Sequence, residues 1–226
     1  MTQTLQEFGD YIHGMVSDRV TSHAVANGEL VLLTDAEHIV PLLTFLRDDE
    51  ACLFSQLMDV TAIDTPSHPA RFEVVYNLLS LVKNRRIRIK LRVDENTAVP
   101  TAADVYPAAN WFEREVWDMY GVFFDNHPDL RRILTDYGFE GHPQRKDFPL
   151  TGYVELRYDE DQKRVVYEKV KLNQAYRSFD FLSPWEGMNH TLPGDEKAVV
   201  PSPSAQAAPP SQTAPAPARP PVEKKA

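Results

Sequence analysis

Carboxylates lie close together between residues 110 and 150, and they are the first candidates for chemistry. Glu113, Glu115 and Asp118 could provide an acid–base pair of the kind that cleaves glycosidic bonds. All three would share one short helix with Arg114, so ion pairing explains them more simply. We predict that Arg114 and Asp118, four residues apart, pair on the side of this helix opposite its apolar residues.

A metal site is the second chemical possibility. His127, Asp129 and His142 could supply ligands, but none stands in a recognised spacing such as H-E-x-x-H. The sequence also contains no nucleophile elbow, Walker A or dinucleotide-binding glycine pattern. The only cysteine, Cys52, rules out an intrachain disulfide or a four-cysteine centre, and its apolar surroundings predict a small buried side chain. We therefore expect no catalytic, metal or cofactor-binding residue on this chain.

The composition indicates one globular domain with extensions. The chain has 226 residues, of which 42% are hydrophobic, so it can build a core. Its formal net charge of -9 argues against a general nucleic-acid binder. No stretch approaches the roughly 20 apolar residues of a membrane span, and the N-terminus lacks the features of a signal or transit peptide. We expect a soluble protein that reaches a membrane only through partners.

Periodicity predicts an α+β domain over residues 1–121, with helices and a small mixed or antiparallel sheet. Apolar spacing predicts helices at residues 4–17, 36–48 and 107–120. Turn pairs and period-two runs predict strands at residues 23–26, 29–34, 52–60, 71–82 and 85–93. Thr4 and Glu7 form an expected capping box, and Gly121 is placed to end the third helix.

The strand at 85–93 alternates between apolar and basic side chains. Its basic face carries Arg86, Arg88, Lys90 and Arg92. This row could be a solvated outer face, a docking surface for an acidic partner or a nucleic-acid contact. No aromatic side chains accompany it, so the stacking platform of an RNA-binding sheet is missing.

After Gly121 the periodicity ends while large side chains continue. These include Phe123, Phe124, Ile133, Leu134, Tyr137, Phe139, Phe148 and Leu150. Prolines and glycines interrupt regular structure, so we expect this stretch to be buried, partly against another chain. Further along, residues 153–158 and 163–170 predict a strand pair. Residues 191–226 form a Pro/Ala-rich tail that we expect to be disordered.

Several short motifs carry a resemblance to a known family. They are Glu113-Arg114-Glu115, Asp118-Met119-Tyr120, His127 to Leu134 (HPDLRRIL), Tyr137-Gly138-Phe139, Gly141-His142-Pro143, Arg145 to Leu150 (RKDFPL), and an ending that contains Trp185. Together they resemble the thirty-kilodalton subunit (the C subunit) of the proton-pumping NADH:quinone oxidoreductase, respiratory complex I. The similarity extends over about residues 5–190 and is tightest in 110–190.

The resemblance implies that the globular domain is followed by a long extended arm, which we place at residues 122–190 and expect to bind a partner. It also implies a non-catalytic structural and assembly subunit in the peripheral arm of that complex. Its expected partner is the forty-nine-kilodalton (D) subunit of the quinone site, with no nucleic acid bound. FMN, iron–sulfur clusters and quinone would be held by other subunits. The complex would lie at the cytoplasmic side of a bacterial inner membrane. The alternative is the equivalent subunit of a ferredoxin- or coenzyme-driven quinone reductase or a membrane-bound hydrogenase.

The resemblance also marks the residues that we expect to carry the family signature and the partner interface. They are Glu113, Arg114, Glu115, Asp118, His127, Arg131, Arg132, Tyr137, Phe139, His142, Arg145, Lys146, Phe148 and Trp185. The basic ones among them could pair with acidic groups or carbonyls of the partner. Alternatively, they pair with Asp129, Asp136 and Asp147 of their own chain.

Overall fold

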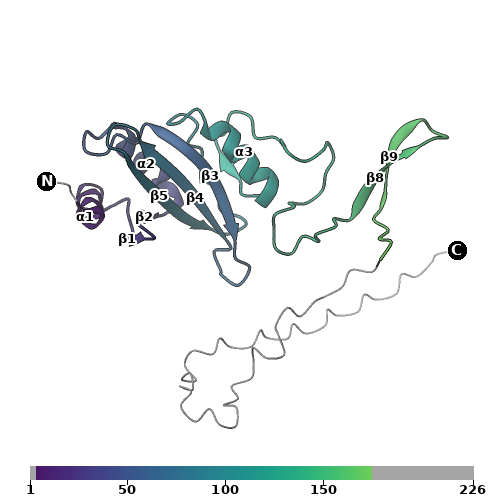
Figure 1. Cartoon of the computed structure of the whole chain (residues 1–226), viewed down its shortest axis with the longest axis horizontal. Coiled ribbons are helices and arrows are strands. Elements are labelled where there is room, and N and C mark those ends of the chain that lie inside the picture. The colour runs from purple at the N-terminus through teal and green to yellow at the C-terminus, as the bar shows by residue number, and fades with distance from the viewer. Residues whose placement is uncertain (1–3, 175–226) are drawn as a thin grey trace, which may run out of the picture. The chain divides into compact units, whose positions relative to one another are not determined.

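The computed structural model describes residues 4–174 (Figure 1). Described residues up to Lys171 belong to one compact unit, and a second unit begins at Leu172. The tail expected at 191–226 and Trp185 lie outside the described residues. Among residues 4–174, no helix has both the length and the apolar character needed to cross a bilayer.

Three α-helices form where apolar spacing predicts them. They are α1 (Leu5–Met15), α2 (Ile39–Asp48) and α3 (Ala109–Tyr120). The capping box before α1 is confirmed, since Thr4 Oγ1 accepts from the Glu7 amide and the Glu7 carboxylate accepts from the Thr4 amide. A short 3-10 turn, Ala36–His38, leads into α2. The expected helix at 107–120 starts two residues late.

Five strands form a mixed sheet, which confirms the α+β class. They are β1 (Ser22–Ala26), β2 (Glu29–Thr34), β3 (Gln56–Asp64), β4 (Phe72–Ser80) and β5 (Arg85–Val93). Their order is β1-β2-β5-β4-β3, and only β2 and β5 are parallel. Asn27 and Gly28 both have positive φ, as the predicted hairpin turn requires. Two short parallel strands, β6 (Val99–Pro100) and β7 (Phe124–Asp125), pair separately.

The expected strand at 52–60 is shifted in the structure. The strand β3 begins at Gln56, while Cys52 lies in the turn before it. Cys52 is nevertheless fully buried, as predicted, and burial raises the pKa of its thiol. The shift arises because Leu53 has positive φ, which is incompatible with a strand that starts at Cys52.

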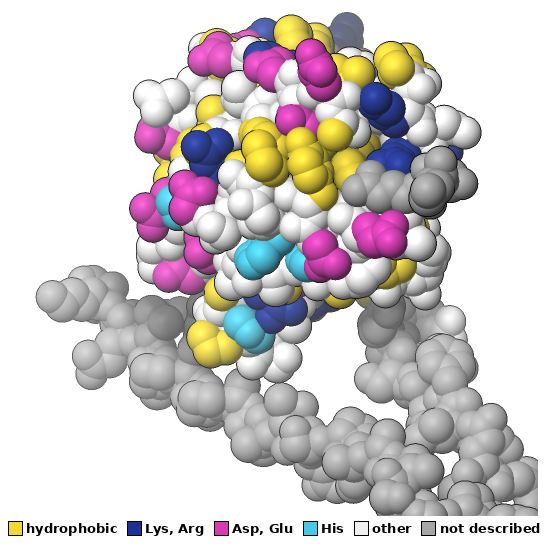
Figure 2. Space-filling view, turned by 90° about the vertical axis from the view of Figure 1, so that its left-hand side faces the viewer, with side chains coloured by type: hydrophobic (Ala, Val, Ile, Leu, Met, Phe, Trp, Pro, Cys, Tyr) yellow, Lys and Arg dark blue, Asp and Glu magenta, His cyan; other side chains and the backbone are white. Residues whose placement is uncertain are grey.

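The alternation of β5 separates core from surface. Its apolar side chains are almost fully buried, and three of its cations pair within the sheet. Arg88 lies 2.8 Å from Glu29, and Lys90 and Arg92 lie 2.7 Å and 3.1 Å from Glu73. Because neighbouring strands already supply the counter-charges, the arrangement favours the solvated outer face. On the side drawn in Figure 2, basic side chains are scattered among acidic ones rather than gathered into one patch.

The buried core ends at β7. Phe124 is 1% exposed, whereas no residue from 125 to 174 is buried as a whole, although the side chain of His127 is enclosed. Of the large side chains expected to be buried, Phe124 is buried within this chain, Ile133, Phe139 and Phe148 are half-buried, and the rest are exposed, with Tyr137 at 95% and Leu150 at 85%. The expectation is therefore wrong within this chain for the exposed ones, and their burial against another chain stays a prediction. The arm instead continues into a two-stranded antiparallel hairpin of β8 (Val154–Asp159) and β9 (Arg164–Lys169), as the sequence predicts.

Candidate partner-binding segment

The arm is fastened to the C-terminal end of α3. The last four carbonyls of a helix lack partners within the helix. Here the Gly121 amide donates to Trp117 O at 2.8 Å. The other three carbonyls accept from the arm: Asp118 O from His142 Nδ1 at 3.0 Å, Met119 O from the Gln144 amide at 3.0 Å, and Tyr120 O from Arg145 Nε at 2.6 Å. Residues 142–145 therefore cap the helix, and the Arg145 charge suits its negative end.

Gly121 makes this close approach possible. Its φ is +79°, a conformation that L side chains rarely adopt. A Cβ at this position would lie 2.5 Å from Arg145 Nη2 and 2.6 Å from the His142 ring. The glycine thus both ends α3, as predicted, and leaves the space in which the two capping side chains sit.

Asp118 fixes the next part of the arm. Its buried carboxylate accepts from Arg132 Nη1 at 2.8 Å and from Thr135 Oγ1 at 2.6 Å. It also accepts from the amides of residues 133–135 at 2.8–3.1 Å. Burial raises the pKa of this carboxyl, but the hydrogen bonds from Thr135 and its neighbours outweigh burial, so the pKa of Asp118 lies well below its usual range.

The predicted pair of Arg114 with Asp118 is wrong. Arg114 is 6% exposed, and its guanidinium donates to the carbonyls of Arg131 at 3.2 Å and Arg132 at 3.4 Å. It also lies 5.0 Å from the centre of the Trp111 ring. Helical periodicity placed both charged side chains on the polar side of α3, but the arm covers that side and supplies their partners. Glu115 alone among the predicted acids of α3 is exposed.

Glu113 is fully buried on α3, which its charge alone did not predict. Its carboxylate accepts from Thr101 Oγ1 at 2.5 Å and from the Ala102 amide at 2.7 Å. Burial raises the pKa of this carboxyl to about 7. The site anchors α3 to the chain just after β6, and no sequence signal pointed to Thr101.

The two imidazoles considered as metal ligands, those of His127 and His142, form hydrogen bonds with the main chain instead. His127, whose side chain is fully buried, donates from Nε2 to Asn110 O at 3.0 Å and accepts at Nδ1 from the Asp129 amide at 3.0 Å. His142 is tied to α3 as described above, and burial lowers its pKa. Within residues 4–174, no three His, Cys, Asp or Glu side chains are grouped to hold a metal ion.

A second anchor lies at the end of β3. Asp64 accepts from both Arg71 Nε at 2.6 Å and Arg71 Nη2 at 2.8 Å, and from the Lys146 amide at 2.7 Å. Arg71 also lies 2.8 Å from Asp147 and 2.6 Å from Glu95. The bidentate hydrogen bond from Arg71 lowers the pKa of Asp64. Nothing in the sequence signalled that a strand end would hold the arm.

Arg131, Arg132 and Arg145 pair within their own chain, but mostly not with the acids expected from the sequence, and the Lys146 side chain forms no ion pair within residues 4–174. Arg131 pairs with Asp129 at 2.8 Å, as that alternative predicts. Arg132 pairs instead with Asp118, Arg145 lies 3.8 Å from Glu95, and the expected acid Asp147 pairs with Arg71. Local sequence proximity was misleading because the arm folds back on α3 and β3.

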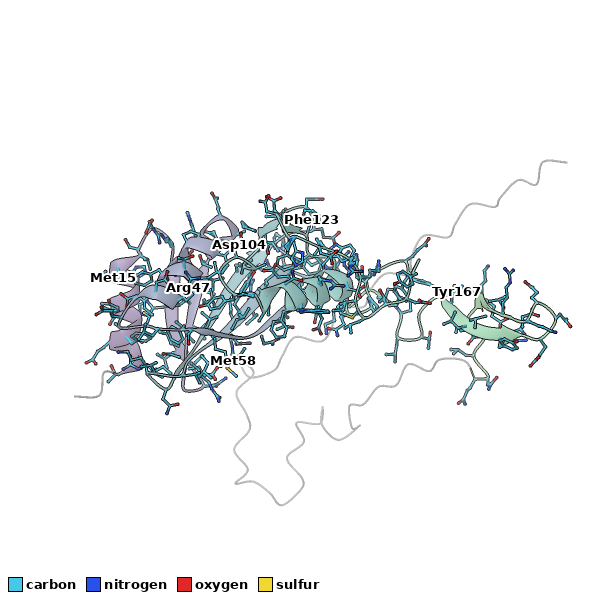
Figure 3. All side chains as sticks on the ribbon, turned by 90° about the horizontal axis from the view of Figure 1, so that it is seen from above. Met15, Arg47, Met58, Asp104, Phe123 and Tyr167 are labelled. Carbon is cyan, nitrogen blue, oxygen red and sulfur yellow. The ribbon has the colours of Figure 1, made fainter. Side chains whose placement is uncertain are left out.

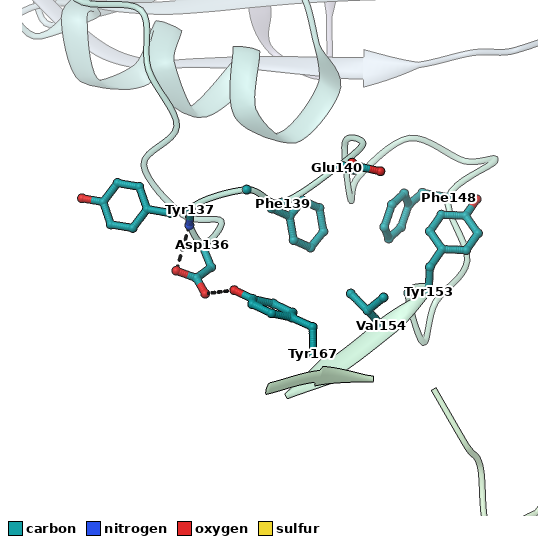
Figure 4. Close-up of a pocket in the computed structure, with 10 residues that line it drawn as sticks. Asp136, Tyr137, Phe139, Glu140, Phe148, Tyr153, Val154 and Tyr167 are labelled. Carbon is teal, nitrogen blue, oxygen red and sulfur yellow. Dashed lines mark hydrogen bonds between the residues drawn. The ribbon is translucent and has the colours of Figure 1, made fainter. Parts of the chain in front are cut away.

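An open aromatic pocket lies within the arm, between its irregular part and its hairpin (Figure 4). Its volume is about 460 Å³, and its lining includes Asp136, Phe139, Phe148, Tyr153 and Tyr167. The Phe148 ring lies 6.0 Å from the Phe139 ring and 5.4 Å from the Tyr153 ring, centre to centre. The Tyr167 hydroxyl, on β9 (Figure 3), donates to Asp136 Oδ2 at 2.5 Å.

One face of the hairpin is apolar. Leu156 is paired with Tyr167, and Tyr158 with Val165, so these four side chains share a face together with Val154, and Lys169, the partner of Val154, lies at the end of this face. Each of the five apolar side chains is between 51% and 58% exposed. Glu155, Arg157, Val166 and Glu168 occupy the opposite face.

Comparison with known proteins identifies the family. The family model described as "Respiratory-chain NADH dehydrogenase, 30 Kd subunit" matches residues 32–154. The chain belongs to this family. The C subunit of NADH-quinone oxidoreductase from Parvibaculum lavamentivorans is 61% identical over 88% of this chain and 99% of its own length. The C subunit from Caulobacter vibrioides is 64% identical over 79% of this chain and 90% of its own.

A solved structure from a different respiratory complex has a similar fold. A chain of the membrane-bound sulfane sulfur reductase, an archaeal respiratory membrane complex, is 28% identical and superposes with a TM-score of 0.56. The match covers 71% of this chain and 98% of that one. The resemblance read from the motifs is thus confirmed. The chain is a member of the complex I assembly, and it is associated with the membrane through that complex.

Proposed function

We propose that this chain is a non-catalytic structural and assembly subunit of the peripheral arm of complex I. Its arm, residues 122–190, binds the forty-nine-kilodalton (D) subunit and thereby supports the quinone site. One observation carries the proposal. No hydrophobic residue from 125 to 174 is buried, and more than half of the large hydrophobic side chains exposed in residues 4–174 lie between Leu134 and Leu172.

The exposed hairpin needs a covering surface. A two-stranded ribbon is marginally stable in water by itself. An apolar face rimmed by polar residues is typical of a protein–protein contact, and such contacts favour aromatic side chains at their centre. The anchors at α3 and β3 hold the arm at its root, which lowers the entropic cost of ordering it on a partner.

The charged signature residues support a structural rather than a catalytic role. The side chains of Glu113, Asp118 and His127 form hydrogen bonds with main-chain groups of the same protein. FMN, iron–sulfur clusters and quinone then belong to other subunits. The likeness to a chain of a sulfane sulfur reductase supports this view, because the fold also serves a complex named for a different acceptor. The protein would lie at the cytoplasmic side of a bacterial inner membrane.

Two single substitutions, one on each face of the hairpin, test the proposal. Leu156→Glu places a charge on the apolar face, and Val166→Glu places the same charge on the opposite face. Leu156 is the more exposed of the two, so damage to the hairpin itself should be no greater there. We expect Leu156→Glu to lower the amount of D subunit that co-purifies with the tagged chain and the amount of assembled complex. Val166→Glu should lower neither to the same extent.

The activity of the remaining complex separates assembly from chemistry. NADH–quinone turnover per assembled complex should stay near wild type in both variants. Normal amounts of complex with no quinone reduction would instead give the chain a catalytic role. Equal assembly of both variants and wild type would show that the hairpin face is not the contact.

A further inference from the structure

The aromatic pocket of Figure 4 carries an unbalanced negative charge. Asp136 and Glu140 are the only ionisable carboxyl groups in its lining, and no Lys, Arg or His is part of it. Glu140 forms no ion pair or hydrogen bond within residues 4–174. Asp136 accepts from its neighbour's amide and from Tyr167, one bond to each oxygen, so each oxygen retains acceptor capacity.

A guanidinium already lies against aromatic rings of α3 and of the arm. Arg132 lies 5.6 Å from the centre of the Trp117 ring and 5.7 Å from that of Phe139. This packing resembles the stacking for which arginine is suited. In the pocket, the Tyr153 and Tyr167 rings offer further faces beside Asp136 and have no cation against them in the described chain. Its volume of about 460 Å³ falls in the range of sites that enclose a small group.

We propose that this pocket receives an arginine side chain of the neighbouring subunit. The aliphatic part of that arginine would lie against the rings, and its guanidinium would meet Asp136 and Glu140. This inference rests on the proposed function, because it names the chemistry by which the arm recognises its partner. Buried arginines that fill aromatic pockets are frequent binding hot spots.

The first test identifies the occupant directly. A photo-reactive benzoylphenylalanine replaces Tyr137, which lines the pocket and is 95% exposed, in the intact complex. After irradiation, mass spectrometry locates the cross-linked peptide. We expect a peptide of another subunit with an arginine at or beside the modified residue. A peptide of another subunit without a nearby arginine would overturn the inference while leaving the proposed function standing. No cross-link to any other subunit would overturn both.

The second test removes the charge and keeps the shape. The double variant Asp136→Asn, Glu140→Gln should dissociate from the solubilised complex about tenfold faster than wild type at low salt, as expected for a desolvated cation site. The matched control is Asp161→Asn in the hairpin turn, outside the pocket, which should dissociate as wild type does. Dissociation of the double variant at the wild-type rate would count against an arginine occupant.

Discussion

Replacing Gly121 by alanine should detach the arm from α3, and Gly138 provides a matched control. The two glycines have nearly equal φ, +79° and +76°. A Cβ at Gly138 would meet nothing within 4 Å, whereas a Cβ at Gly121 would collide with Arg145 and His142. Both variants carry the backbone cost of an L residue at positive φ, about 1–2 kcal/mol. Only Gly121→Ala should also lose the capping contacts.

The additional loss of stability in Gly121→Ala follows from the two hydrogen bonds that the Arg145 and His142 side chains make to α3. The bond from the charged Arg145 to Tyr120 O contributes about 1.5–3 kcal/mol, and the bond from His142 to Asp118 O about 0.5–1.5 kcal/mol. The Arg145 side chain can move away at lower cost than the His142 ring. We therefore expect Gly121→Ala to be less stable than Gly138→Ala by about 2–4 kcal/mol.

Urea unfolding of the full chain measures this difference, and hydrogen exchange locates it. The Gln144 amide is bonded to Met119 O, so its exchange should speed up in Gly121→Ala and stay slow in Gly138→Ala. Unfolding free energies within about 0.5 kcal/mol of each other, with equal Gln144 protection, would refute the idea that the arm caps α3.

Three further predictions concern other parts of the chain. Asp118→Asn disrupts a buried ion pair and should lower the free energy of unfolding in urea by about 3 kcal/mol or more. The exposed control Asp129→Asn should lower it by less than about 1 kcal/mol, and equal losses would contradict the role of Asp118 as an anchor. Burial raises the pKa of Glu113 to about 7, so the folded chain binds this proton more tightly than the unfolded one, with its pKa of about 4.3. Stability should therefore fall as pH rises between those two values, and Glu113→Gln should flatten that slope; parallel profiles would refute it. Deleting residues 199–226 should leave assembly and quinone reduction near normal; loss of assembly would show that the tail binds a partner.

Local signals in the sequence were enough to predict the framework of the domain. The Thr4 capping box, the Asn27-Gly28 turn and the alternation in 85–93 each act over a few residues, and each appears as expected. Gly121 likewise ended α3 because positive φ is a local requirement. These features need no information about distant parts of the chain.

The anchors of the arm could not be predicted in the same way. Asp118 meets residues 132–135, and Asp64 meets Lys146, which is 82 positions away. An acidic residue on a helix looks the same in sequence whether it faces water or a folded-back segment. The motifs between residues 113 and 148 pointed to the right family, but geometry alone shows which charges meet.

The double anchor of the arm has a consequence for the timing of assembly. Lys146 needs the finished end of β3, while His142 and Arg145 need the finished end of α3. In a newly synthesised chain, residues 142–146 can therefore adopt their fixed position only after β3 and α3 have formed. Non-local contacts of this kind form late in folding. If the arm binds another subunit as proposed, a misfolded domain would offer that subunit an arm that has no fixed starting point.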